Sequence, residues 1–263
     1  MKIDYLISTH KKTDKEIEQI IIDSNLHNAS IIIGNQCCER DYERIFTFGD
    51  NYVKVIYSSS KGVSRNRNEL LLKATADYIT FLDDDIYFED TVQKNLDKYI
   101  DNHWEAFRVN VVSDNPQRAI KQYNTGKLGF FDLKSVGVWG IFYKRELLIS
   151  NNFRFELKVG PGAQYPAGED SIFHRRFLKK CKVIQTTTSG IHAKQVESTW
   201  QGANRNERNE LIGNGYTYSI LFGFLAFPFG VYHIIKHKKN YNTKFIECIK
   251  YFSIGVKAQR GEK

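Results

Sequence analysis

The feature that most constrains the fold is a regular alternation of short apolar runs with helical segments along the first 113 residues. Apolar spacing and capping residues predict helices at 14–27, 62–76 and 89–103. β-Branched and aromatic runs predict strands at 3–9, 30–35, 52–58, 77–82 and 105–113. The pattern predicts an α/β fold with a parallel or mostly parallel sheet, and 263 residues suffice for one such domain with an appendage.

Polar residues directly follow three of the predicted strands. They are Ser8 and Thr9, Asn35 and Gln36, and the triplet Asp83–Asp85. Ligands of such sheets bind beyond the carboxyl ends of the strands. We therefore expect these side chains to converge on one edge of the sheet.

The triplet of Asp83, Asp84 and Asp85 ends a run, YITFL, that is apolar on both faces of the strand. Adjacent carboxylates repel one another and are costly to bury. Mg²⁺ and Mn²⁺ prefer carboxylate oxygens and often bind one or two of them together with a substrate diphosphate. An Asp-rich turn is the alternative. We expect a divalent metal site.

Two further motifs stand at predicted helix starts. In KGVSRNRN, Arg67 and Asn68 are expected in the first helical turn, where they either hold an anion or are simply solvated. In AGEDSIF, Glu169 and Asp170 follow a long Gly- and Pro-rich loop. They either cap the helix or include a general base.

The second half of the chain is less regular. The segment 129–148 predicts two strands and a helix, and the segment 182–192 predicts a strand that ends at His192. No internal repeat is present, so the chain is not expected to be a repeat protein.

The order of these motifs resembles glycosyltransferase family 2, which has the GT-A fold, and especially bacterial enzymes that build capsular, exopolysaccharide or lipopolysaccharide glycans. The similarity runs from residue 1 to about 192, through NQ, KGVSRNRN, ADYITFLDDD, GPGAQYPAGED and a His after a strand. It implies a Rossmann-like, mostly parallel sheet flanked by helices at 1–200. A C-terminal basic, aromatic helical extension would follow at 201–263.

The resemblance also implies roles for the acidic residues. DDD matches the DxD-type metal motif, so Asp85, supported by Asp83, would bind Mn²⁺ or Mg²⁺, and Asp84 or Asp83 would reach the ribose. GED matches the family's ED motif. Asp170 would be the catalytic base, and Glu169 would position the base or the acceptor.

The remaining implied roles concern the nucleotide. Arg67 and Asn68 match the RN pair near the nucleotide, and four residues fall where the base and ribose are held: Ser8, Thr9, Asn35 and Gln36. GNQCCERD departs from the acidic residues that usually follow the second strand.

His192 lies where some GT-A enzymes supply a further metal ligand, although a lone His is more often structural. Trp200 is followed by Gln201 and does not match the Q-x-x-R-W motif of processive enzymes.

The implied reaction is metal-dependent, inverting transfer of a sugar from a nucleotide-sugar, expected to be UDP-linked, to a hydroxyl of a glycan or lipid-linked acceptor. One alternative is a metal-dependent nucleotidyltransferase, which would release pyrophosphate. Another is a non-catalytic nucleotide- or polyanion-binding module, which would have no use for Asp170.

The C-terminal quarter carries most of the excess positive charge. Of the net +8, about +6 lies between Asn204 and the end, and no Lys, Arg, Asp or Glu occurs from Leu211 to Ile235. The stretch suits attachment to an anionic membrane surface, a packed core or oligomer contact, or a membrane span. We expect peripheral attachment, with no nucleic-acid partner.

The N-terminal sequence MKIDYLISTHKK has no signal-peptide pattern. Cys37, Cys38, Cys181 and Cys248 have neither zinc-site nor disulfide-framework spacing, which indicates a reducing cytosol. The composition, 41% hydrophobic and 26% charged, excludes wholesale disorder. We therefore expect a cytoplasmic protein at the inner face of the bacterial cell membrane.

Overall fold

The computed structural model describes residues 2–101, 103–134, 136–194 and 206–261. Its main sheet contains the strands β1 Ile3–His10, β2 Ser30–Gln36, β3 Tyr42–Phe48, β4 Asn51–Ser58, β5 Tyr78–Asp83, β7 Ala106–Arg108, β9 Gly126–Leu128, β10 Ile141–Lys144 and β11 Val183–Gln185. A smaller sheet contains β6 Ile86–Phe88, β8 Val111–Ser113 and β12 Ile191–Ala193.

The described helices cover the sheets and form the C-terminal region. They are α1 Asp14–Ser24, α2 Val63–Lys73, α3 Asp90–Asp101, α4 Phe130–Leu133, α5 Arg145–Ser150, α6 Glu169–Leu178, α7 Glu207–Phe222, α8 Ala226–Lys236 and α9 Phe245–Arg260. Short 3-10 turns are η1 Pro116–Arg118, η2 Gly223–Leu225 and η3 Lys238–Asn240.

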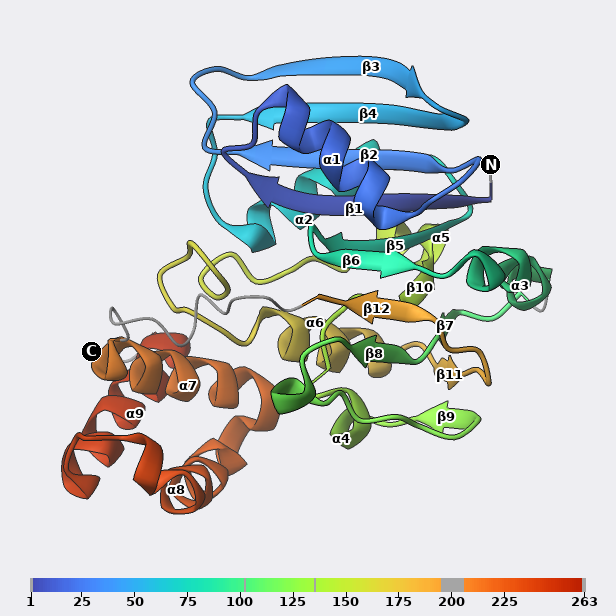
Figure 1. Cartoon of the computed structure of the whole chain (residues 1–263). Coiled ribbons are helices and arrows are strands. Elements are labelled where there is room, and N and C mark those ends of the chain that lie inside the picture. The colour runs from blue at the N-terminus through green and yellow to red at the C-terminus, as the bar shows by residue number, and fades with distance from the viewer. Residues whose placement is uncertain (1, 102, 135, 195–205, 262–263) are drawn as a thin grey trace.

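The main sheet is mostly parallel, as the sequence predicts. Its order in the described chain is β3-β4-β2-β1-β5-β10-β7-β11-β9 (Figure 1). The strands β4, β2, β1 and β5 are parallel neighbours, whereas β3, β10 and β9 pair antiparallel. The smaller sheet has the order β6-β12-β8 and begins directly after the acidic triplet. The architecture is thus α/β with a C-terminal helical region.

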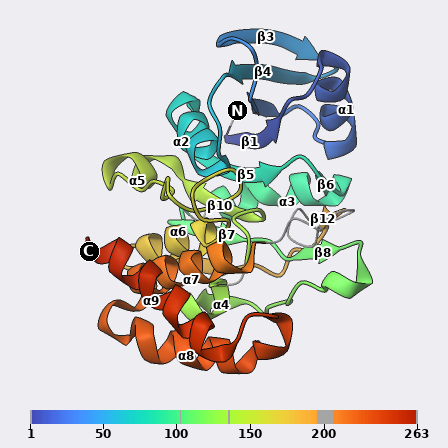
Figure 2. The same ribbon diagram turned by 90° about the vertical axis from the view of Figure 1, so that its left-hand side faces the viewer.

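Helices cover both faces of the main sheet, because α1 and α2 lie on opposite sides of it (Figure 2). On one side α1 packs through Ile17, Ile20 and Ile21, which belong to a core cluster that also includes residues of α3. On the other side α2 packs through Leu70 and Leu71, in a cluster shared with α6. The capping box of Thr13 and Glu16 fixes the start of α1.

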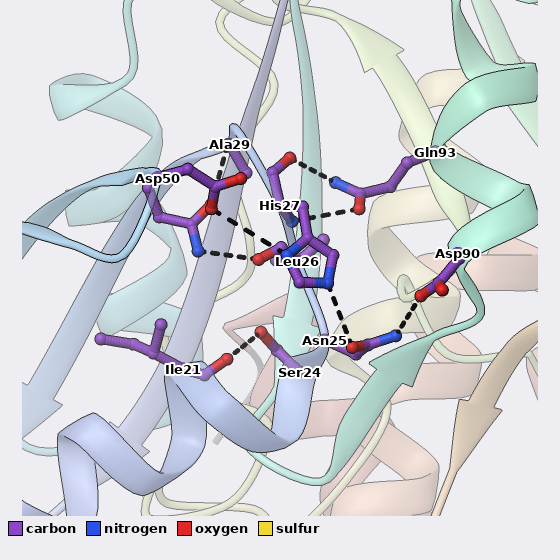
Figure 3. A network of polar contacts seen from close by, with 10 residues as sticks. Ile21, Ser24, Asn25, Leu26, His27, Ala29, Asp50, Asp90 and Gln93 are labelled. Atoms are coloured by element: carbon purple, nitrogen blue, oxygen red, sulfur yellow. Dashed lines mark hydrogen bonds and ion pairs between the residues drawn. The ribbon is translucent and has the colours of Figure 1, made fainter.

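A polar network fastens the end of the sheet that lies away from the strand carboxyl ends (Figure 3). The Gln93 amide of α3 both donates to and accepts from the main chain of His27, and Asn25 donates to Asp90. Asn51 bridges the main chains of Leu26 and Ala29. These bonds hold the α1–β2 connection against α3 and β4, and the open cleft of about 610 Å³ beside them lies at this end.

The structure corrects several sequence-based boundaries. The predicted strand at 105–113 is divided into β7 and β8, which belong to different sheets, and the one at 182–192 is divided into β11 and β12. The first strand predicted in 129–148 is helix α4. The edge strand β3 was not predicted. Short segments of this kind are decided by their neighbours in the sheet and not by local pattern.

The C-terminal helices pack on one another and on the rest of the protein. The pair α7 and α9 encloses a small core, with Leu211, Phe252 and Val256 among its buried members. The helical run Glu207–Lys236 is long and apolar enough to cross a membrane by length and composition alone. It consists of α7 and α8, which are separated at Gly223 and contact each other. The expected boundary between residues 200 and 201 lies outside the described residues.

The close approach of β2 and α2 generates a prediction. The Asn66 side chain donates to the Gly34 carbonyl at 2.8 Å, and a Cβ on Gly34 would lie 1.9 Å from Asn66 Oδ1. Gly34→Ala should therefore cost about 2 kcal/mol of unfolding free energy, measured in urea. Adding Asn66→Ala opens the space, so the double variant should cost less than the sum of the two single variants. Additive losses would contradict the steric explanation.

Candidate active site

The strand register brings the predicted polar residues to one edge, as expected. Ser8 pairs with both Gly34 and Asp83. Thr9 pairs with Asn35, and His10 pairs with Gln36. The carboxyl ends of β2, β1 and β5 thus lie side by side. Three segments that are distant in sequence form one polar edge.

The amide side chains at this edge hold the surrounding loops. Asn35 accepts from the Lys12 main chain at 3.0 Å and donates back to it at 2.7 Å, which fixes the β1–α1 turn. Gln36 donates to Ser60 at 3.0 Å and fixes the loop before α2. The buried Ser8 hydroxyl has no hydrogen-bond partner among the described residues.

The centre of the site is the buried guanidinium of Arg67. It donates to Asp83 through one nitrogen and to Asp170 through the other, both at 2.7 Å. The Arg67 side chain is 3% exposed, whereas those of Asp83 and Asp170 are 40% and 20% exposed. Its Cζ lies 5.4 Å from the centre of the Phe155 ring. Arg67 thus joins the acidic triplet directly to the GED motif.

Asn68 has a different environment from its neighbour. Its amide donates to the Phe155 carbonyl at 3.0 Å and accepts from the Phe155 N–H at 2.8 Å. We expected Arg67 and Asn68 in the first turn of this helix. Helix α2 begins at Val63, however, so both residues lie in its second turn. Asn68 therefore holds the segment that carries Phe155 against α2.

The acidic triplet is held from two sides. Thr9 donates to Asp84 at 2.5 Å, and Arg67 holds Asp83. The Asp85 carbonyl accepts from the Lys194 N–H, which joins the triplet to the end of β12. In the described chain, no three His, Cys, Asp or Glu side chains form a group that could hold a metal ion. These carboxylates therefore fit a metal only if a ligand such as a diphosphate supplies further oxygens.

Glu169 and Asp170 begin α6. Gly168 caps this helix with φ of 114°, a conformation that favours glycine. Burial raises the pKa of Asp170 above its ordinary value, and the Arg67 charge opposes this rise. Burial, followed by the charge of Asp170, raises the pKa of Glu169. The two neighbouring carboxyls therefore do not ionise independently.

The loop before α6 is fastened by α2. Ser64 donates to the Val159 carbonyl at 2.7 Å, and the Val63 N–H donates to the Pro161 carbonyl at 3.0 Å. A Cβ on Gly160 would lie 3.1 Å from Ser64 Oγ and 3.2 Å from Glu169 Cδ. The loop, α2 and the first turn of α6 therefore pack without space for larger side chains.

Helix α7 supports the same loop from the other side. Thr217 donates to the Ala167 carbonyl at 3.3 Å, and a Cβ on Gly168 would lie 2.4 Å from the Thr217 hydroxyl oxygen. Tyr165 and Tyr216 pack with ring centres 5.1 Å apart. The C-terminal region thus contacts the main chain immediately before the catalytic candidates.

His192 faces a separate group of residues. Its ring nitrogens lie 2.8 Å from Glu89 and 3.1 Å from Asp114, and its ring stacks on Tyr87. Partial burial lowers the pKa of His192, but the bonds to Glu89 and Asp114 outweigh this and raise it. Glu89 and Asp114 thus hold the His192 ring in place, and its role as a further metal ligand stays a prediction.

Sequence reasoning missed the supporting residues Phe155, Thr217 and Ser64. An aromatic residue in a loop and a hydroxyl in an apolar helix have no distinguishing local pattern. Their roles come from contacts between segments 87 to 95 residues apart, or, for Thr217, 50 residues apart. The glycines of GPGAQYPAGED were the available signal, because positive φ and close packing both favour glycine.

Comparisons with known proteins agree with this architecture. Residues 4–181 match the family model described as Glycosyl transferase family 2. Among proteins with curated descriptions, none matches the sequence.

Solved structures of S. aureus TarS share the fold. The 1-349 fragment in complex with UDP-GlcNAc has a TM-score of 0.64 at 13% identity, and the match covers 100% of this chain and 93% of that one. The complex of the fragment with UDP has a TM-score of 0.59 at 15% identity, with 100% and 92% covered. A further crystal structure of TarS has a TM-score of 0.57 at 14% identity, with 97% of this chain and 43% of that one covered.

The buried bridge of Arg67 generates a stability prediction. Arg67→Met leaves two partly buried carboxylates without their cation, so we expect a loss of about 3 kcal/mol in unfolding free energy. Arg67→Lys keeps the charge but not the two-nitrogen geometry, and should lose less. Arg65→Met, an exposed position of the same helix, is the control and should change stability by about 0.5 kcal/mol or less. Equal urea midpoints for Arg67→Met and Arg65→Met would contradict the bridge.

Proposed function

This chain belongs to glycosyltransferase family 2, and we propose that it transfers a sugar, with inversion, from a UDP-linked donor to an acceptor hydroxyl. The observation that carries the proposal is the Arg67 bridge, which holds Asp83 and Asp170 in one site. The TarS structures contain UDP-GlcNAc and UDP. They support a uridine nucleotide-sugar as the donor of this enzyme.

The nucleotide would lie along the polar edge of the sheet. Ser8 offers a buried hydroxyl without a partner among the described residues, and Thr9 lies beside it. Asp84 or Asp83 would accept hydrogen bonds from the ribose hydroxyls. Asn35 and Gln36 would act by fixing the turns that border the nucleotide. Arg67 would hold Asp83 in place at this edge through its hydrogen bond of 2.7 Å.

Asp85, supported by Asp83, would hold Mn²⁺ or Mg²⁺ together with the donor diphosphate. The carboxylates suit such an ion, because hard divalent cations take oxygen ligands and accept substrate phosphates as partners. When bound, the ion would neutralise the charge that develops on the nucleoside diphosphate leaving group. His192 stays a predicted further ligand of the ion, and its two nitrogens lie beside Glu89 and Asp114 in this structure.

Asp170 is the proposed general base. The acceptor oxygen attacks the anomeric carbon from the face opposite the diphosphate, and the bond between that carbon and the diphosphate oxygen breaks. The proton of the acceptor hydroxyl passes to Asp170, so a single displacement inverts the anomeric centre. The raised pKa of Asp170 favours this role, because a base is most effective when its pKa is close to the working pH. Glu169 would position the acceptor.

The proposed acceptor is a glycan or a lipid-linked glycan, within the synthesis of a surface polysaccharide. A lipid-linked acceptor accords with peripheral attachment to the cytoplasmic face of the cell membrane. The positive excess of the last quarter of the chain supports this location, since anionic lipids attract basic segments.

The proposed function is tested with a panel of nucleotide-sugars in the presence of Mn²⁺. UDP-linked donors should raise the midpoint of thermal unfolding, because ligands stabilise the state that they bind. Turnover with an acceptor should release UDP. Release of pyrophosphate would indicate nucleotidyl transfer instead, and no shift with any UDP-sugar would refute the donor assignment.

Asp170→Asn should lower the transfer rate by about 10² to 10⁴ while donor affinity stays nearly unchanged. Asn keeps the shape and can still serve at a helix start. In the wild type, the rate should fall as the pH drops through the raised pKa of Asp170, because the base becomes protonated. The residual rate of the variant should lack this dependence. Near wild-type turnover of Asp170→Asn would direct attention to Glu169, for which Glu169→Gln is the matched variant.

Asp85→Ala should abolish the part of UDP affinity that depends on Mn²⁺. The expected calorimetric result is that the variant binds UDP equally with Mn²⁺ and with EDTA, whereas the wild type binds more tightly with Mn²⁺. Asp90→Ala, at the exposed start of α3, is the control. Wild-type affinity that does not change on addition of EDTA would refute metal-dependent binding.

A further inference from the structure

The two helices of the uncharged stretch from Leu211 to Ile235 have different environments. Helix α7 packs against α9 and the loop before α6, and seven of its residues are buried. Helix α8 buries only Ala226, Gly230 and Ile234, which are spaced four residues apart on one face. Both helices carry apolar and aromatic residues, but α8 presents much more of its length to solvent than α7 does.

The outward surface of η2 and α8 is apolar. Phe224 is 85% exposed, Tyr232 is 62% exposed and Ile235 is 59% exposed. Leu225 and Phe227 are also exposed, at 42% and 44%, and we call this set of five residues the α8 surface. A helix on the surface of a soluble protein normally shows polar residues there. On η2 and α8 the solvent side carries apolar residues instead. Exposed apolar patches of this kind mark interaction sites.

Basic residues follow the α8 surface at once. Lys236, Lys238 and Lys239 stand within four residues of Ile235, and no acidic residue occurs between Leu211 and Lys236. Farther along, α9 adds Lys250 and other cations, whereas Glu247 is the acid of that helix. An exposed aromatic helix bordered by lysines has the chemistry of a segment that binds in the interface of an anionic membrane.

We propose that the α8 surface lies in the interfacial layer of an anionic bilayer, with its aromatic residues in the acyl boundary and Lys236–Lys239 at the lipid headgroups. Interfacial helices enter this layer by about 5–10 Å. The α8 surface lies at the end of the molecule opposite β3 and β4 (Figures 1 and 2). The inference rests on the proposed membrane attachment and is independent of sugar transfer.

Two other arrangements are disfavoured by the structure. A span of Glu207–Lys236 would require α7 and α8 to become one straight helix. That change would break the hydrogen bond from the Thr217 hydroxyl to the Ala167 carbonyl and the packing of α7 on α9. A symmetric contact between two copies would bring like-charged lysines together, since such an interface places the same patch on both sides. Anionic lipid complements both the apolar residues and the charge.

The experiment measures sedimentation of the full-length protein with phosphatidylcholine vesicles, with and without phosphatidylglycerol. The variant Phe224→Ser/Phe227→Ser/Tyr232→Ser should lose more than about tenfold in partitioning to both vesicle types. Lys236→Gln/Lys239→Gln should lose about 30-fold on anionic vesicles only, and wild-type binding should weaken with salt. Ile45→Ser/Leu72→Ser, at exposed apolar positions elsewhere, is the matched control and should bind as the wild type does.

Thermal unfolding and UDP release are measured on every variant, so that loss of vesicle binding is distinguished from loss of fold or of activity. Wild-type protein that does not sediment with anionic vesicles would refute the inference, and so would an aromatic variant that sediments as well as the wild type. If light scattering shows a wild-type dimer that the aromatic variant converts to a monomer, while vesicle binding is unchanged, the α8 surface binds a second copy and the inference is wrong.

Discussion

The site depends on one buried cation that is shared by two carboxylates. Arg67 reaches Asp83 at the end of a strand 16 residues away and Asp170 at the start of a helix 103 residues away. The buried Arg67 charge would be costly without these two partly buried carboxylates. The planar guanidinium suits the task, because its separate nitrogens can each donate to a different carboxylate. The face of Phe155 lies beside this guanidinium.

Helix α2 organises the parts around that cation. Its first turn fixes the loop before α6 through Ser64, its side chain Asn66 fits into the space left by Gly34, and Asn68 holds the main chain of Phe155. The polar edge of the sheet and the loop before α6 are therefore held by the same helix. A displacement of α2 would disturb both acidic motifs, because Arg67 of this helix contacts Asp83 and Asp170.

The C-terminal region has two different tasks. Helix α7 completes the support of the loop before α6 through Thr217 and Tyr216, and it is as much a part of the site's framework as α2. Helix α8 buries one narrow face and leaves Tyr232 and Ile235 mostly exposed, as Phe224 is in the preceding turn. A continuous uncharged stretch of sequence is thus divided, at Gly223, between a structural helix and the proposed membrane-binding surface.

The sequence by itself determined the α/β class, the main helices and the meeting of three polar strand ends, because periodicity and strand order are local or nearly local properties. It also identified Asp83–Asp85, Arg67, Glu169 and Asp170 as the polar residues of interest. Only the tertiary structure decided their partners: that Arg67 joins the two acidic motifs, and that His192 faces Glu89 and Asp114. It alone divided the apolar tail into α7 and α8. Pairing and burial depend on contacts between distant segments, and no local pattern encodes which segments meet.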